Sequence, residues 1–100
     1  MARQYRFTRD IEADLDIEAL DARDRSFVLA VLRAVLPNEP EKQTRNRKRT
    51  RPNNLGEWRL RAHPWRIFYD VFGDVVRVNA VVYKPRETAY RRGKVVDLDE

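Results

Sequence analysis

The sequence predicts an α+β domain in which helices pack on an antiparallel sheet, and three observations favour this class. Residues 56–71, GEWRLRAHPWRIFYDV, alternate with a period of two, which is typical of half-buried strands. Residues 21–36 repeat apolar side chains with the spacing of an amphipathic helix. Gly73 and Asp74 separate two alternating runs and favour a tight hairpin. A chain of 100 residues has room for one such domain, residues 1–100.

The N-terminal part predicts a short strand at residues 3–7, followed by a helix capped by Thr8. Residues 11–20, IEADLDIEAL, alternate apolar and acidic side chains, but Ala, Glu and Leu favour a helix over a strand. The acids of this helix either form a solvated face or hold a hard cation, and the former interpretation is favoured because no further ligand spacing accompanies them. They are Asp10, Glu12, Asp14, Asp16 and Glu18.

A second helix is expected to begin at the N-cap Asp21 and to end at Pro37. Its apolar side chains recur at i, i+3, i+4, i+7 and i+8, so this face should pack on the sheet. The side chains of this face are Val28, Val31, Leu32, Val35 and Leu36.

Residues 38–54 are polar and interrupted by prolines, which predicts a long loop. The segment from residue 42 to residue 51 carries six bases and no acid, so its like charges repel unless an anion lies against them. A nucleic-acid contact is the favoured interpretation, and a solvated loop is the alternative. The six bases are Lys42, Arg45, Arg47, Lys48, Arg49 and Arg51.

With Gly73 and Asp74 as a two-residue turn, the strands on either side pair in one register. That register places Asp70 opposite Arg77, which assigns these two residues a structural ion pair. The remaining expected pairs are Val71 with Val76, Tyr69 with Val78 and Ile67 with Ala80 on the core side, and Phe68 with Asn79 on the other side.

The preceding hairpin turns at His63 and Pro64. Any symmetric pairing about this turn places Arg61 opposite Arg66, with Arg59 nearby on the same face. Because like charges across a ladder are destabilising and no acid is expected beside them, we interpret these arginines as an anion site. The alternative is that the long side chains splay into water. A two-residue loop would require a cis bond before Pro64, so a longer loop is expected.

The composition favours an anionic partner. The net charge is +5, and 17 arginines stand against 4 lysines. Arginine presents a planar fork that suits phosphate, although GC-rich coding also raises the arginine content. The chain has no cysteine, which excludes disulfides, and its single histidine excludes a histidine-based zinc site or paired histidine catalysis. The sequence shows neither the apolar core of a signal peptide nor an apolar run long enough to span a membrane. We therefore expect a cytoplasmic protein without metal, cofactor or membrane contact.

Guanidinium groups on a sheet face can bind a phosphodiester and stabilise the charge that develops on phosphorus during strand cleavage. RNA cleavage without a metal uses the 2′-OH as nucleophile, so the protein needs to supply orientation, charge and proton transfer. Tyr90 or Glu57 is the expected proton-transfer group.

The motif W-R-L-R, then Arg66 and I-F-Y-D-V, with an R-x-x-x-Y tail, resembles the RelE/ParE superfamily of toxin–antitoxin toxins. The resemblance covers nearly the whole chain. It implies a short N-terminal strand and a helical hairpin packed on a twisted antiparallel sheet, together with a cognate antitoxin. In the RelE-like branch it implies cleavage of mRNA on the ribosome, which blocks translation. The alternatives are a ParE-like inhibitor of DNA gyrase without nuclease activity, or an inactive relative that binds nucleic acid.

The resemblance also implies roles for particular residues. The catalytic set would be Arg59, Arg61, Arg66, Arg86 and Tyr90, in which Arg61 and Arg66 hold phosphate, Arg59 and Arg86 stabilise charge and Tyr90 assists proton transfer. Independently of the resemblance, Lys84 and the six bases of the loop are expected to contact RNA because of their basic character. Two positions depart from the family pattern, because Glu57 stands where a strand lysine is common and Pro85 stands where a further base is expected. These departures affect catalysis more than RNA binding.

Overall fold

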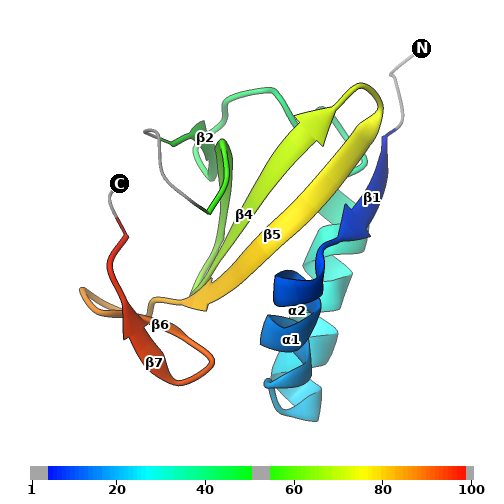
Figure 1. The fold of residues 1–100 in the computed structure, drawn as a ribbon. Helices are drawn as coiled ribbons and strands as arrows, with labels where there is room; N and C mark the ends of the chain where they lie inside the picture. The colour runs from blue at the N-terminus through cyan, green and yellow to red at the C-terminus, as the bar shows by residue number, and fades with distance from the viewer. Residues whose placement is uncertain (1–4, 51–54, 99–100) are drawn as a thin grey trace.

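A computed structural model of the chain describes residues 5–50 and 55–98. Two helices, α1 (Ile11–Glu18) and α2 (Ala22–Val35), lie on one face of a seven-stranded sheet (Figure 1). The strands are β1 (Arg6–Arg9), β2 (Arg47–Arg49), β3 (Trp58–Ala62), β4 (Trp65–Phe72), β5 (Val75–Tyr83), β6 (Ala89–Arg91) and β7 (Lys94–Val96).

The strand order is β2-β3-β4-β5-β6-β7, and every neighbouring pair along this path is antiparallel. The first strand, β1, pairs with β5 in parallel, because the chain crosses both helices before it enters the main sheet. The sheet is strongly twisted, and β2 and the β6–β7 hairpin bend away from the helices (Figure 1). The predicted α+β class is therefore confirmed. The first strand, Arg6–Arg9, overlaps the predicted strand at residues 3–7, of which residues 3 and 4 lie outside the described residues.

A single residue, Asp10, separates the end of β1 from the start of the first helix. Asp10 is its N-cap, and the carboxylate accepts a hydrogen bond from the backbone N–H of Ala13 at 2.8 Å. The expectation of Thr8 as the cap was wrong, because Thr8 is still part of β1, opposite Arg77. Predicting a helix over these residues despite their two-residue alternation was correct, since the buried side chains follow helical spacing at Ala13, Asp16 and Ile17.

The second helix has the predicted limits. The Asp21 carboxylate caps it by accepting from the Asp24 N–H at 2.8 Å, and Leu36 ends it immediately before Pro37. Its apolar face packs against the sheet, as the i, i+3, i+4, i+7, i+8 spacing predicts. The main core consists of Ala13, Ile17, Val28, Leu32 and Leu36 from the helical layer and Trp58, Leu60, Trp65, Ile67, Tyr69, Val76, Val78 and Val81 from the sheet.

The β4–β5 hairpin turns at Gly73 and Asp74 as expected, with Gly73 at φ 60°. The pairs nearest the turn, including Asp70 with Arg77, are confirmed. Beyond them a β-bulge at Phe68 and Tyr69 shifts the register by one residue. The two farther predicted pairs were therefore wrong, because Ile67 lies opposite Val81 and Phe68 lies opposite Ala80.

The β3–β4 hairpin places Arg61 opposite Arg66, as predicted. The expected longer loop was wrong: Ala62 pairs with Trp65, so His63 and Pro64 form a two-residue loop with a cis peptide bond between them. A cis proline in the second central position is the geometry of a type VI turn.

The basic segment is not a loop throughout. Arg47–Arg49 forms β2, which pairs with β3 at the edge of the sheet. The prediction of an unbroken loop over residues 38–54 overlooked this strand, because its run of bases shows no apolar alternation. It is specified instead by its pairing with β3, in which Arg47 lies opposite the buried Leu60.

Candidate nucleic-acid interface

Four basic side chains of β2, β3 and β4 lie on the face of the sheet that the helices do not cover. On β3, Trp58 and Leu60 belong to the core, so the alternating residues Arg59 and Arg61 lie on the opposite face. Arg66 of β4 is the cross-strand partner of Arg61, and Lys48 of β2 is the partner of Arg59. We call Lys48, Arg59, Arg61 and Arg66 the basic cluster.

Burial differs within the basic cluster. Arg66 is only 7% exposed, and its Nη1 donates to the Trp65 carbonyl oxygen at 3.4 Å. Arg59 is half-buried, whereas Lys48 and Arg61 are exposed. Within residues 5–50 and 55–98, the Arg61 guanidinium forms no hydrogen bond or ion pair, although its backbone N–H donates to the Asn46 carbonyl at 2.6 Å. Arg61 and Lys48 are thus the members most accessible to an anion.

A small apolar cluster borders the basic cluster on the same face. Phe68 lies two residues along β4 from Arg66, opposite Arg59, and it packs with Ala80, Val82 and Ala89. Val96 and Leu98, at the end of the β6–β7 hairpin, cover these side chains together with Leu55. The β6–β7 hairpin therefore forms one wall of the sheet face that carries the basic cluster, which we call the basic face.

The nearby carboxylates have other partners. Asp70 accepts from Arg77 Nη2 at 3.3 Å and from Asn79 Nδ2 at 2.8 Å, which confirms the predicted ion pair. Glu57 forms an ion pair with Arg49. Glu57 is therefore held at the β2–β3 edge by a base, and the structure does not bring it to Arg61 or Arg66.

Arg47 is an internal structural residue. It is only 7% exposed, and its guanidinium donates to the carbonyl oxygens of Glu39 and Val35, near the end of α2. Carbonyl groups at a helix C-terminus carry partial negative charge, so a cation is stabilised there. The expectation that Arg47 contacts RNA is corrected by this burial.

The other loop bases that the structure describes lie at the surface. Lys42 pairs with Glu39 at 3.5 Å, Arg49 lies 5.7 Å over the Trp58 ring, and Arg45 is exposed. Arg51 lies outside the described residues. Lys48 is the loop base that projects on the same face as the strand arginines, by its pairing with Arg59.

Among the tail residues, Tyr90 lies away from the basic cluster. Tyr90 pairs with Tyr83, and their ring centroids are 6.4 Å apart. Tyr83 in turn packs 5.0 Å from the core residue Trp65, so Tyr90 lies on the helix side of the sheet. Arg86 is exposed in the β5–β6 connection. Lys84 is half-buried and lines a shallow depression with Ala89 and Val96, on the side of the basic face.

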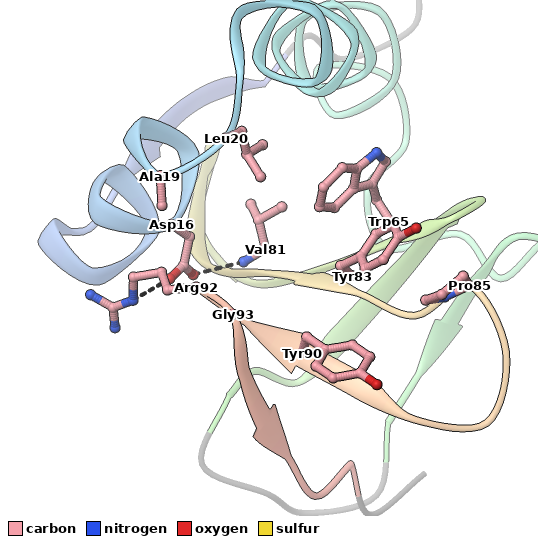
Figure 2. Close-up of a pocket in the computed structure, with 10 residues that line it drawn as sticks. All are labelled: Asp16, Ala19, Leu20, Trp65, Val81, Tyr83, Pro85, Tyr90, Arg92 and Gly93. Carbon is pink, nitrogen blue, oxygen red and sulfur yellow. Dashed lines mark hydrogen bonds and ion pairs between the residues drawn. The ribbon is translucent and has the colours of Figure 1, made fainter.

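A groove of about 710 Å³ opens beside Tyr90 on the helix side (Figure 2). The three aromatic rings of Trp65, Tyr83 and Tyr90 form one side, and the end of α1 forms the other. The other lining residues are Asp16, Ala19, Leu20, Val81, Pro85, Arg92 and Gly93.

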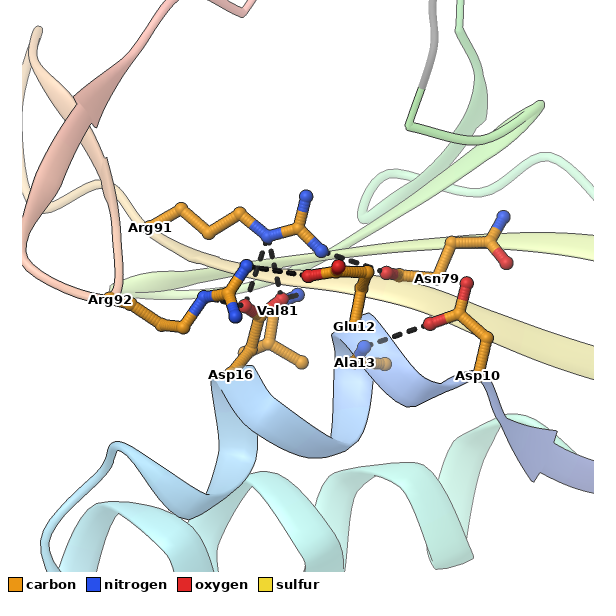
Figure 3. A network of polar contacts seen from close by, with 8 residues as sticks. All are labelled: Asp10, Glu12, Ala13, Asp16, Asn79, Val81, Arg91 and Arg92. Atoms are coloured by element: carbon orange, nitrogen blue, oxygen red, sulfur yellow. Dashed lines mark hydrogen bonds and ion pairs between the residues drawn. The ribbon is translucent and has the colours of Figure 1, made fainter.

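Asp16 lies at the centre of a polar network that sequence reasoning missed (Figure 3). It is 2% exposed, accepts from the Val81 N–H at 3.0 Å and contacts the guanidinium groups of Arg91 and Arg92. The predicted solvated face was therefore wrong at this position. The available signal was the helical spacing of Ala13, Asp16 and Ile17, which puts the carboxylate on the buried face.

Two other acids of the first helix form ion pairs at the surface. Asp14 pairs with Arg9 at 2.9 Å, and Glu12 pairs with Arg92 at 2.7 Å. Nowhere in residues 5–50 and 55–98 do three His, Cys, Asp or Glu side chains gather where they could hold a metal ion. No helix within the same ranges is long and apolar enough to cross a membrane.

No protein-family model matches the sequence, and no curated protein matches it either. Among solved structures, the chain is similar to a chain of the toxin–antitoxin complex RelBE2 from Mycobacterium tuberculosis, with a TM-score of 0.71 and 21% sequence identity. The similarity covers 83% of this chain and 94% of that chain. The predicted fold, a helical hairpin packed on a twisted antiparallel sheet, is therefore confirmed and is shared with that chain.

Proposed function

We propose that this protein is the toxin of a toxin–antitoxin module and acts as a metal-free, ribosome-dependent mRNA endoribonuclease. The observation that carries the proposal is the basic cluster, on a fold shared with a chain of the RelBE2 complex. Its bases project from three adjacent strands, so the backbone fixes their spacing before any ligand binds.

In this proposal the phosphodiester lies over the β3–β4 ladder. Arg61 is exposed and attracts the phosphate, while Arg66, largely buried, offers a guanidinium that is held in place. Charge-assisted bonds from fixed donors stabilise the additional negative charge that develops when the 2′-OH attacks phosphorus. Arg59 and Lys48 extend the positive surface along the RNA strand.

In this conformation, the two candidate groups for proton transfer lie away from Arg61 and Arg66. Tyr90 lies on the helix side of the sheet, and Glu57 is paired with Arg49. Tyr90 can assist cleavage only if the RNA passes the sheet edge or the β6–β7 hairpin moves. This placement favours a second candidate, a non-nuclease toxin that inhibits DNA gyrase through the same basic surface.

Two assays on the purified full chain separate the candidates. In a translating extract, the endoribonuclease cuts mRNA inside translated codons and leaves DNA supercoiling by gyrase unchanged. A gyrase inhibitor blocks supercoiling and leaves mRNA intact. A protein that does neither, and does not arrest growth when induced, would exclude both toxin proposals and leave the inactive RNA-binding relative.

We also propose a cognate antitoxin as the partner that neutralises the chain. An acidic antitoxin segment over the basic cluster would compensate its charge and block RNA access at once. Co-expression with the product of the adjacent reading frame tests this: a stable complex and restored growth are expected, and unchanged arrest in the presence of that product would contradict it.

A further inference from the structure

The edge of β5 that faces away from β4 has a gap in its backbone pairing. The β1 ladder ends at Val78, and β6 meets β5 at Tyr83. Between them, two backbone groups of β5 bond to side chains instead of a strand. The Val81 N–H donates to Asp16 Oδ2 at 3.0 Å, and the Asn79 carbonyl accepts from Arg91 Nη2 at 3.1 Å.

The two side chains that fill this gap also bind each other. Arg91 Nε lies 3.0 Å from Asp16 Oδ1 and 2.9 Å from Oδ2. Arg92, the next residue, places its Nε 3.0 Å from Oδ1 and its Nη2 2.7 Å from Glu12. One carboxylate of α1 therefore holds two consecutive arginines of the β6–β7 hairpin and one backbone N–H of β5 (Figure 3).

The hairpin has few other attachments to the body of the protein. Within residues 5–50 and 55–98, its ladder with β5 is the single pair Tyr83 and Tyr90, whose ring centroids are 6.4 Å apart, and its other apolar contact is the small cluster around Ala89 and Val96. A buried carboxylate cannot be removed without leaving its guanidinium partners uncompensated, and Arg91 is itself mostly buried. The hairpin's position thus depends on Asp16 more than on backbone pairing.

We propose that Asp16 is a positioning residue, which fixes the β6–β7 hairpin as the wall of the basic face and thereby controls how RNA fits against Arg66. The consequence for RNA rests on the proposed function. Asp16 acts from the opposite side of the sheet, through Ala89 and Val96, which pack on Phe68 and Val82. Val82 is the cross-strand partner of Arg66, so movement of the hairpin alters the immediate surroundings of that guanidinium.

The test is hydrogen exchange on the full chain, with Asp14→Asn as the matched control. Asp14 is on the same helix but forms an exposed pair with Arg9. We expect Asp16→Asn to speed amide exchange of residues 89–96 by about tenfold while residues 58–72 keep their protection. Arg91→Gln, which leaves Asp16 with Arg92, should do the same if Asp16→Asn does not fold. Arg91→Lys keeps the charge and should retain most of the protection.

Affinity for a fluorescent single-stranded RNA oligonucleotide provides the functional readout. Asp16→Asn should raise its dissociation constant by about fivefold, and Asp14→Asn should leave it unchanged. Unchanged exchange in the hairpin, or equally faster exchange throughout the chain, would refute the positioning role. Faster hairpin exchange with unchanged RNA affinity would refute its effect on the basic face. If the wild-type chain binds no RNA, the proposed function fails, whereas the exchange comparison still decides the role of Asp16.

Discussion

Arg61 and Arg66 are direct cross-strand partners on the uncovered face of the sheet. Two guanidinium groups in this relationship repel each other across the ladder. A phosphate bound between them would attract both groups and offset the repulsion. Arg61 is also exposed, so its side chain has little to contribute to packing.

Arg61→Ala should therefore separate stability from function. We expect the free energy of unfolding to change by no more than about 0.5 kcal/mol, because an exposed like-charged partner is removed. Affinity for single-stranded RNA should fall, and the slope of log affinity against log salt should fall by about one phosphate contact. Arg23→Ala, on the exposed surface of α2, is the matched control and should change neither quantity. Equal loss of affinity in both variants would mean that only total charge matters.

Arg47 and Lys48 are adjacent in the chain but should respond in opposite ways. Arg47→Ala removes the donors to the Glu39 and Val35 carbonyls and should lower the free energy of unfolding by about 2 kcal/mol. Lys48→Ala should leave stability unchanged and weaken RNA binding. Urea unfolding and RNA titration of both variants check this. A stable Arg47→Ala protein would contradict the structural role assigned to Arg47.

Tyr69 should produce a specific pH dependence. Its hydroxyl donates to the Pro40 carbonyl at 2.6 Å, and burial raises the pKa of Tyr69 above its ordinary value, while the charge of Arg47 opposes this less strongly. A raised folded-state pKa means that its stabilisation is complete below about pH 10 and is lost as the pH rises further. Tyr69→Phe should be less stable by about 1 kcal/mol at pH 8, because the Pro40 carbonyl loses its donor.

Urea unfolding at pH 8 and pH 11 isolates this group, since the other tyrosines are present in both proteins. The stability difference between wild type and Tyr69→Phe should shrink at the higher pH. A difference that stays constant or widens would contradict the raised pKa of Tyr69.

Gly56 is required by a close backbone approach. A Cβ built there lies 2.9 Å from the Tyr69 nitrogen and 3.1 Å from its carbonyl oxygen, and neither backbone atom can move independently of β4. Gly56→Ala should destabilise the protein by about 2 kcal/mol in thermal or urea unfolding. Gly93→Ala is the comparison, because its site is open but has φ 78°, so a cost of about 1 kcal/mol is expected. A smaller effect at Gly56 than at Gly93 would contradict the close approach.

The elements that the sequence predicts best are those with a local periodic signal. The second helix, the β4–β5 turn and the pairing of Arg61 with Arg66 follow from side-chain spacing and turn chemistry within a few residues. The bulge at Phe68 and Tyr69 has no such signal, and it reversed the predicted face of Ala80. Strand β2 likewise depends on its partner β3 rather than on its own composition.

The candidate site shows the same division. Alternation along β3 and β4 is sufficient to place the strand arginines on one face. The side of the sheet on which Tyr90 lies depends on Tyr83, whose ring packs on the distant Trp65, and the burial of Arg47 depends on the carbonyl groups near the end of α2. Neither arrangement follows from side-chain alternation. The burial of Asp16 requires Arg91, which lies 75 residues away in the chain.

We propose that the basic cluster makes this protein a toxin that cleaves translated mRNA. The most direct measurement maps RNA 5′ ends in cells induced to express wild type, Arg61→Ala or Arg23→Ala. New ends inside translated codons should accompany growth arrest for wild type and Arg23→Ala and should be lost with Arg61→Ala. Growth arrest with intact mRNA, or cleavage that persists undiminished in Arg61→Ala, would contradict it.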